Sequence, residues 1–226
     1  MNKFYNFVTR LHFKKILISC LALSSLAFTS CLPQISVKAG NSDEATVFFS
    51  TGFSPSFAKT LKNLSGLDQS SAIFNKDDIL QLLNSAGAVD TSASLPAENE
   101  IAATGRIPAL SENVLAKAGI IKRTENSLTL TIGSKQIVNF YDFLNDEAKS
   151  YLDLMMIPAL IGEKMNVEEY SELLSSMYGP AFADEIIKGK LTIGISSPNG
   201  KKQIKESVSL GELLTQTEER NWTVKW

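Results

Sequence analysis

The sequence predicts an α+β domain in which an antiparallel sheet of β-hairpins is packed by several helices on one face. Two observations lead to this class. Pairs of strand-like segments are separated by short turns of Gly, Asn, Ser and Pro, as in residues 190–209. Other segments carry apolar residues at helical spacing, as in residues 167–178. The hairpins would supply the sheet, and the helices would cover it.

A basic segment followed by an apolar segment opens the chain. Residues 1–15 contain no acidic residue and four basic ones, Lys3, Arg10, Lys14 and Lys15, and residues 16–28 are almost entirely apolar or small. This is the pattern of a secretory leader. Thirteen residues would rise only about 20 Å as a helix, short of the roughly 30 Å hydrocarbon core of a bilayer. We therefore expect residues 1–30 to be a signal peptide and not a membrane span.

Two cysteines end short segments of similar pattern, "LISC" at 17–20 and "FTSC" at 28–31. Only Cys31 has the whole apolar run in front of it. On these residues the chain resembles bacterial lipoprotein precursors, in which a lipid is attached to the cysteine of a Leu-small-small-Cys lipobox and the leader is cut before it. Phe28 in place of Leu is similar to the looser lipoboxes of spirochaetes. The resemblance covers the first 31 residues and implies lipid attachment at Cys31, with the protein in the cell envelope, facing the periplasm or the cell exterior.

Two other processing states remain open. Val37, Lys38 and Ala39 have the spacing of an ordinary signal peptidase site, and a cut after Ala39 would release an unanchored protein. In an uncut chain Cys31 would be a small buried thiol. If the lipid is attached, residues 31–44 are expected to form a flexible tether. The thirteen residues after Cys31 would have an end-to-end distance of about 20 Å. Residues 45–226 then form a single globular domain.

The residue types that follow the leader exclude several kinds of chemistry. His12 and Cys20 lie in the leader, so residues 31–226 contain no His and no Cys other than Cys31. This excludes Ser-His-Asp and Cys-His catalysis, zinc sites with the usual ligands, and internal disulfides. The chain has 22 basic and 24 acidic residues, and the leader holds four of the basic ones, so the remainder has a net charge of −6. We expect no metal, no cofactor and no nucleic-acid partner.

The first half of the domain predicts a strand, three helices and a long loop. The loop is expected at 86–110, which contains no aromatic residue, and a loop of this length is either functional or mobile. The expected elements are a strand at 45–50, a helix at 54–66 with Phe57, Leu61 and Leu64 on one stripe, a helix between Asn75 and Gly87, and a short helix to Ala118 capped by Ser111.

The second half predicts hairpins, four helices and a final strand. The expected hairpins join 119–123 to 127–132, 127–132 to 135–140 across Gly133 and Ser134, and 190–196 to 201–209. Helices are expected at 146–156, 167–178, 180–188 and 210–216, and a strand at 221–226 with Trp222, Val224 and Trp226 on one face. The sequence Lys-Gln-Ile occurs at 135–137 and again at 202–204, which suggests a duplicated hairpin-plus-helix unit.

Adjacent acidic residues and one Ser-Lys pair are the candidates for catalysis. Three of the five acid pairs begin one or two residues after Asn75, Asn145 and Asn166, where acids stabilise a helix N-terminus, and helix capping explains them better than two-carboxylate catalysis does. The five pairs are Asp77/Asp78, Asp146/Glu147, Glu168/Glu169, Asp184/Glu185 and Glu218/Glu219.

Ser56 and Lys59 have the spacing that resembles serine penicillin-recognising enzymes, in which a lysine one turn on activates a serine. The triplet 111–113, Ser-Glu-Asn, resembles their second motif, and the third motif is absent. With 22 Ser and 15 Lys in residues 31–226, one or two such spacings are expected by chance. We therefore interpret Ser54 or Ser56 as a helix cap and Lys59 as a surface charge, and we assign no catalytic residue.

The apolar stretch 154–161, with Met155, Met156 and a break at Pro158, is where we expect any ligand. A Met-rich wall beside the striped helix 167–178 could deform around an acyl chain or a partner helix, although such stripes are more often core. The expected function is a non-enzymatic binding or structural module, held on a membrane by its lipid, with an unknown envelope protein as partner. The alternatives are carriage of a lipid or other apolar ligand, and a hydrolase using Ser56 and Lys59.

Overall fold

The computed structural model describes residues 33–64, 66–144, 146, 149, 152–153 and 155–226. It confirms the α+β class. The elements are β1 (Gln34–Ala39), β2 (Ala45–Gly52), α2 (Pro55–Leu64), α3 (Lys76–Ser85), β3 (Val89–Ser94), β4 (Glu100–Ile107), the 3₁₀ turn η1 (Leu110–Glu112), α4 (Val114–Lys117), β5 (Ile121–Thr124), β6 (Ser127–Ile132), α5 (Ser134–Asp142), α7 (Pro158–Ile161), α8 (Val167–Tyr178), α9 (Pro180–Lys188), β7 (Lys190–Ser196), β8 (Gln203–Ser209), α10 (Leu210–Thr215) and β9 (Arg220–Lys225).

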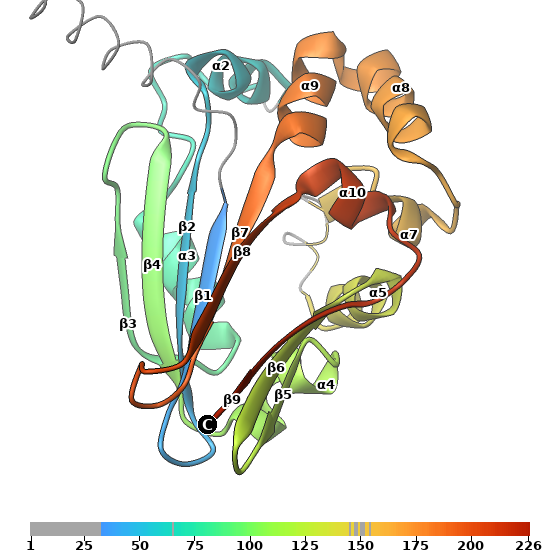
Figure 1. The fold of residues 1–226 in the computed structure, drawn as a ribbon. Helices are drawn as coiled ribbons and strands as arrows, with labels where there is room; N and C mark the ends of the chain where they lie inside the picture. The colour runs from blue at the N-terminus through green and yellow to red at the C-terminus, as the bar shows by residue number, and fades with distance from the viewer. Residues whose placement is uncertain (1–32, 65, 145, 147–148, 150–151, 154) are drawn as a thin grey trace, which may run out of the picture.

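Two sheets enclose the main core (Figure 1). The larger sheet has the strand order β3-β4-β2-β1-β7-β8, and the smaller has the order β5-β6-β9. Neighbouring strands are antiparallel except for β1 and β7, which are parallel. Strands β4 and β7 bury every second residue, as expected for a sheet with one covered face. The core between the sheets contains Val37, Ile193, Leu128 and Trp222.

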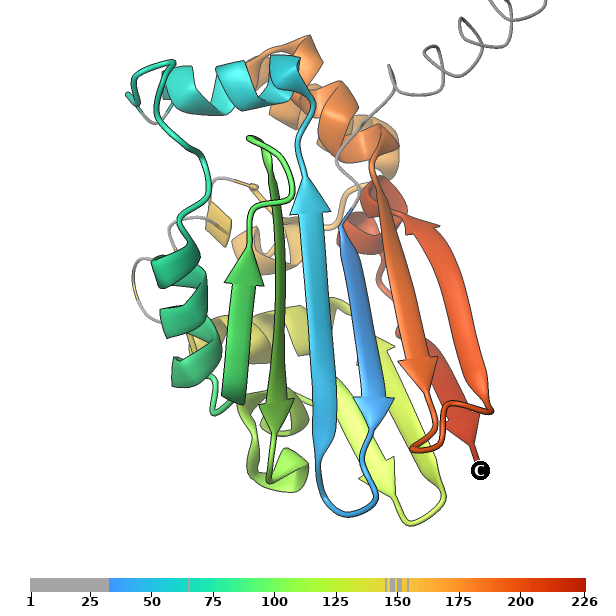
Figure 2. The same cartoon turned by 90° about the vertical axis from the view of Figure 1, so that its left-hand side faces the viewer.

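A second core lies at one end of the larger sheet, among α2, α8 and α9. Its buried members include Phe57 of α2, Tyr170 and Leu174 of α8, and Phe182 and Ile186 of α9. The Phe57 and Phe182 rings lie 5.0 Å apart, between their centroids. Figures 1 and 2 show that α2 and α9 stand beyond the strand ends at this side of the sheet, so this second core extends the molecule along the strand axis.

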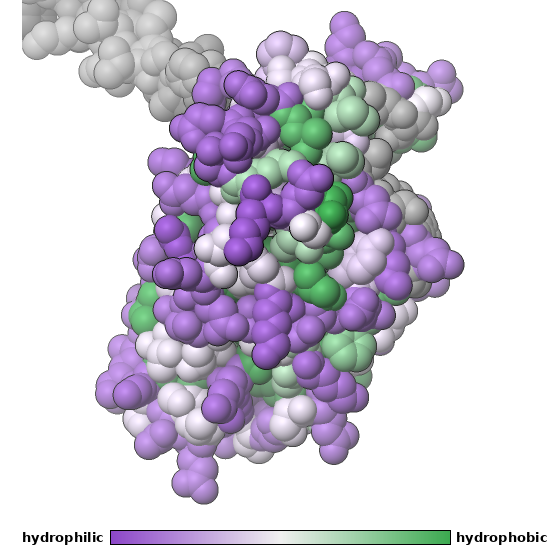
Figure 3. Space-filling model, turned by 90° about the vertical axis from the view of Figure 1, so that its right-hand side faces the viewer, coloured by the Kyte–Doolittle hydropathy of each residue, from purple (hydrophilic) through white to green (hydrophobic). Residues whose placement is uncertain are grey.

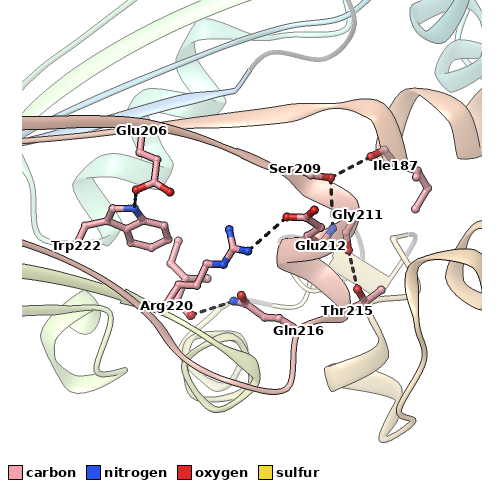
Figure 4. A network of polar contacts seen from close by, with 10 residues as sticks. Ile187, Glu206, Ser209, Gly211, Glu212, Thr215, Gln216, Arg220 and Trp222 are labelled. Atoms are coloured by element: carbon pink, nitrogen blue, oxygen red, sulfur yellow. Dashed lines mark hydrogen bonds and ion pairs between the residues drawn. The ribbon is translucent and has the colours of Figure 1, made fainter.

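Polar contacts connect β9 of the smaller sheet to β8 of the larger sheet and to α10 (Figure 4). Trp222 of β9 donates its indole N–H to Glu206 of β8 over 2.8 Å, which joins one sheet to the other. Arg220 of β9 forms an ion pair with Glu212 of α10, with 3.4 Å between nitrogen and oxygen. Since both side chains of the ion pair are exposed, it adds little to stability, whereas Trp222 is buried and its hydrogen bond holds β9 against the larger sheet.

The structure corrects the prediction of a flexible tether at 31–44. Residues 34–39 form β1, which pairs with β2 on one side and with β7 on the other. Val37 and Ala39 are buried, and Ile35 packs against the same core. The physical reason is that apolar residues at 35, 37 and 39 alternate with polar residues at 34, 36 and 38. This pattern favours a strand more strongly than the surrounding Pro, Gly and Ser favour a flexible segment. A cut after Ala39 would remove a strand from the middle of the sheet.

The prediction of a long loop at 86–110 is also wrong. Most of this segment forms β3 and β4, and β4 pairs with β2 along its whole length. Its buried positions are small or aliphatic: Ile101, Ala103, Gly105 and Ile107. Gly105 suits a closely packed position, because a Cβ atom there would lie 3.0 Å from the Cβ of Ala88 and 3.1 Å from a methyl carbon of Thr91, and both neighbours would have to shift.

The hairpin expected across Gly133 and Ser134 does not form, because residues 134–142 are helix α5. The Lys-Gln-Ile triplets therefore lie in a helix at 135–137 and at the start of β8 at 202–204, which rules out the duplicated unit. The expected cap Ser111 is also corrected. Asn113 caps α4 by accepting a hydrogen bond from the Leu115 amide, whereas Ser111 contacts Asp43.

The other expected elements are confirmed where the structure describes them. The 121–132 and 190–209 hairpins form with antiparallel registers. Helices α8, α9 and α10 lie within a residue of their expected bounds, and β9 buries Trp222 and Val224. Five of the eleven residues of the helix expected at 146–156 lie outside the described residues.

Candidate functional site

A cavity of about 420 Å³ lies between α5, α7 and the residues that lead into α7. Val138, Leu160 and Ile161 contribute apolar side chains, and Val138 and Ile161 are about 40% exposed at its rim. The full lining is Val138, Tyr141, Asp142, Leu152, Asp153, Met156, Ile157, Ala159, Leu160 and Ile161. Figure 3 views the side of the molecule that carries α7, α8 and α10. It shows exposed hydrophobic residues among polar ones near the middle of this face.

Local backbone chemistry builds the α7 wall. Pro158 is the first residue of α7, where its missing N–H costs no hydrogen bond. The preceding Ile157 has φ of −59° and ψ of 122°, as is usual before proline, and it is 4% exposed, so it anchors the start of α7 in the protein interior. Gly162 ends the helix with φ of +76°, a left-handed conformation that glycine adopts at low cost. One short helical turn is thus held at both ends, with Ala159, Leu160 and Ile161 facing the cavity.

Met156 adopts a left-handed backbone with φ of +48°, which costs about 1–2 kcal/mol for a residue with a side chain. The hydroxyl of Tyr170 on α8 donates to the carbonyl oxygen of the adjacent Met155. Tyr170 is fully buried, and burial raises its pKa well above the ordinary value. The hydrogen bond of Tyr170 therefore connects the second core to the turn that places Met156 in the cavity wall.

The mouth of the cavity is acidic. The hydroxyl of Tyr141 donates to Asp153 over 2.9 Å, and Asp142 and Asp153 both line the cavity. The pKa of Tyr141 is raised, first by this hydrogen bond and then by burial and by the charges of Asp153, Asp142 and Asp146. Lys149 lies over the Tyr141 ring, 5.2 Å from its centroid. An apolar pocket with carboxylates at its mouth can accept an apolar group that carries a hydrogen-bond donor or a positive charge.

The structure places this cavity in the Met-rich segment that the sequence singled out, but helix 167–178 does not line it. That helix supports the cavity indirectly, because its Tyr170 hydroxyl donates to the Met155 carbonyl, next to the lining residue Met156. The α5 side, with Val138, Tyr141 and Asp142, was missed because residues 135–140 were interpreted as a strand. Spacing of three and four residues between Ile137, Phe140 and Tyr141 was the signal for a helix.

The Ser-Lys candidate is not assembled into a catalytic site. Ser56 and Lys59 are both exposed on α2. Ser111 contacts Asp43, which precedes β2, whereas Ser56 follows β2, so the two motifs lie at opposite ends of this eight-residue strand. At about 3.4 Å per residue, the strand separates them by roughly 25 Å. Ser54 accepts a hydrogen bond from the Phe57 amide and so caps α2, as the alternative interpretation expected.

Two of the acid pairs act as expected at helix starts. Asn75 accepts a hydrogen bond from the Asp77 amide at the start of α3. At the start of α8, Asn166 and Glu169 form a reciprocal capping box. The described ranges contain no group of three or more His, Cys, Asp and Glu residues arranged to hold a metal ion. None of the helices in the described part of the chain has the length and hydropathy needed to span a membrane.

Cys31 lies outside the described residues, so lipid attachment there stays a prediction. Comparison of the chain with protein-family models and with curated proteins gives no match.

Proposed function

We propose that this protein is a lipid-anchored, non-enzymatic binding module of a bacterial cell envelope, and that it binds a short apolar segment of a partner in the cavity between α5 and α7. The observation that carries the proposal is the combination of a cavity of about 420 Å³ lined by Val138, Leu160 and Ile161 with carboxylates at its mouth. Ligand pockets in proteins occupy about 300–1,000 Å³. The lipid anchor rests on Cys31 and the leader before it.

The size of the cavity favours docking over carriage of a free lipid. At ~30 Å³ for each water-sized group, 420 Å³ holds about 14 such groups, which is one short chain or ring system. With ~0.3 kcal/mol per heavy atom, 14 atoms supply about 4 kcal/mol, which corresponds to a Kd of about 1 mM. A carrier would lose such a ligand, whereas a partner that makes further contacts outside the cavity would stay bound.

Charge favours a basic partner. Asp142 and Asp153 line the cavity, and residues 31–226 carry a net charge of −6. A Lys or Arg beside the apolar segment of the partner would meet these carboxylates, whereas an acidic partner would be repelled.

The test uses three small probes that share one alkyl chain and end in an amine, an alcohol or a carboxylate. Binding is followed by NMR chemical-shift changes on a soluble form that begins at Leu32. We expect shifts at α5 and α7, with the amine binding most tightly and the carboxylate least. The variant Ala159→Phe, which fills the cavity, should abolish these shifts, and Ala72→Phe, at an exposed loop position, should leave them unchanged.

Two results would count against the proposal. If Ala159→Phe binds the amine as well as the wild type does, the cavity is not the site. If an apolar molecule remains in the purified native protein and is lost only on delipidating extraction, as shown by mass spectrometry, carriage replaces docking.

A further inference from the structure

The start of β1 determines which end of an anchored domain lies next to the bilayer. The Pro33 carbonyl accepts a hydrogen bond from the Thr192 amide over 2.8 Å, and Gln34 is already paired with both neighbouring strands. Cys31 precedes Pro33 by two residues, which span at most about 7 Å. A lipid on Cys31 therefore leaves almost no freedom between the bilayer and this end of the sheet. This step rests on the lipid anchor of the proposed function.

Helices α2 and α9 extend beyond the start of β1 at this end (Figures 1 and 2). Helix α9 runs directly into β7 through Gly189, and its nine residues are about 14 Å long at 1.5 Å per residue. This length is about twice the reach of the two residues between Cys31 and Pro33. The anchor cannot hold the helices clear of the bilayer, so they must lie at the level of the headgroups.

The surface at this end suits a membrane interface. Residues 173–183, which form the end of α8 and the start of α9, contain no Asp, Glu, Lys or Arg. Met177 lies in this segment and is 55% exposed, more than any other large hydrophobic side chain that the structure describes. Leu67, which follows α2, is 43% exposed. Transfer of exposed apolar side chains of an uncharged segment from water to the headgroup and acyl boundary of a bilayer lowers the free energy.

We propose that the end of the domain formed by α2 and the α8–α9 corner rests on the lipid bilayer, with Met177 in the interface, and that the β1–β2 turn points away from the membrane. The turn and the C-terminus lie together at the opposite end of the molecule in Figures 1 and 2. The surface takes a bilayer as its partner. The cavity between α5 and α7 remains on the side of the domain.

The test compares two labelled sites in the full chain, expressed with its leader, purified in detergent and reconstituted into phosphatidylcholine–phosphatidylglycerol vesicles. The lipid occupies the thiol of Cys31 and Cys20 leaves with the leader, so an introduced cysteine is the only free thiol. Met177→Cys places a nitroxide at the proposed interface. Ser42→Cys places one in the exposed β1–β2 turn, about 20 Å from the start of β1 along the six residues of that strand.

The nitroxide at position 177 should be relaxed strongly by oxygen and weakly by a water-soluble nickel chelate, and the nitroxide at position 42 should show the reverse. If Met177→Cys does not fold, Leu67→Cys reports on the same end. Equal nickel accessibility at both sites, in protein that floats with the vesicles, would overturn the docked orientation and leave the anchor standing. Wild-type protein that does not float with the vesicles would overturn the anchor and the orientation together.

Discussion

Replacing Tyr170 by Phe tests how the second core holds the cavity wall. The change removes the hydroxyl that donates to the Met155 carbonyl. A hydrogen bond of this kind contributes about 0.5–1.5 kcal/mol, and a buried carbonyl left without a donor costs about 1–3 kcal/mol. Because Tyr170 is fully buried, water cannot easily replace the hydroxyl. We expect the free energy of unfolding to fall by about 1–3 kcal/mol, which lowers Tm by about 2–4 °C per kcal/mol.

The measurement is urea unfolding followed by circular dichroism at neutral pH, with an unchanged m-value as evidence that only stability has changed. Tyr178→Phe on the same helix is the matched control, because the Tyr178 hydroxyl has no hydrogen bond to any residue that the structure describes. It should change stability by less than about 0.5 kcal/mol. Equal effects of the two substitutions would refute the role of the Tyr170 bond.

The same tyrosine gives a pH dependence. Burial, followed by the nearby Tyr178, raises the pKa of Tyr170 in the folded state above the ordinary value of about 10. Above pH 10 the unfolded chain has lost this proton and the folded chain keeps it. Stability is therefore fully present below pH 10 and falls by up to about 1.4 kcal/mol per pH unit above it. In Tyr170→Phe this part of the alkaline slope should be missing.

Two further substitutions test the contacts that position β9 and α8. Trp222→Phe removes the N–H that donates to Glu206, and it should lower the free energy of unfolding in urea by about 1.5–3 kcal/mol; no change would mean that the contact between the sheets is not formed. Asn166→Ala breaks the capping box with Glu169 and should cost about 1 kcal/mol by the same assay, whereas an unchanged midpoint would contradict the cap.

Elements with a local signal could be predicted from the sequence. The turn between β7 and β8, the Pro180 start of α9 and the capping box of α8 each combine a strong breaker or cap with a clear period. These signals act within a few residues, so they do not depend on how the rest of the chain packs. The α+β class followed from them.

Elements whose signal depends on distant partners could not be predicted. The small residues of β4, such as Ala103 and Gly105, have low strand propensity, and they form a strand because β2 and β3 pair on both sides. In α5, Gly133 and Ser134 were interpreted as a hairpin turn although they begin a helix. The parallel pair of β1 and β7 joins residues 158 positions apart, which no local pattern reveals.

The candidate site was predicted only in part, for the same reason. The segment with Met156 and Pro158 was located from its composition, because Met-rich apolar runs broken by proline are visible in a sequence. Its opposite wall depends on where α5 packs, and the hydrogen bond from Tyr141 to Asp153 appears only once that helix is in place.

The mass and the N-terminal residue of the mature protein, measured on membranes by intact-protein mass spectrometry, test whether Cys31 carries a lipid. We predict a chain that begins at Cys31 and carries the added mass of a lipid, recovered in the detergent phase. An unmodified chain that begins at Gly40, recovered in the aqueous phase, would contradict it.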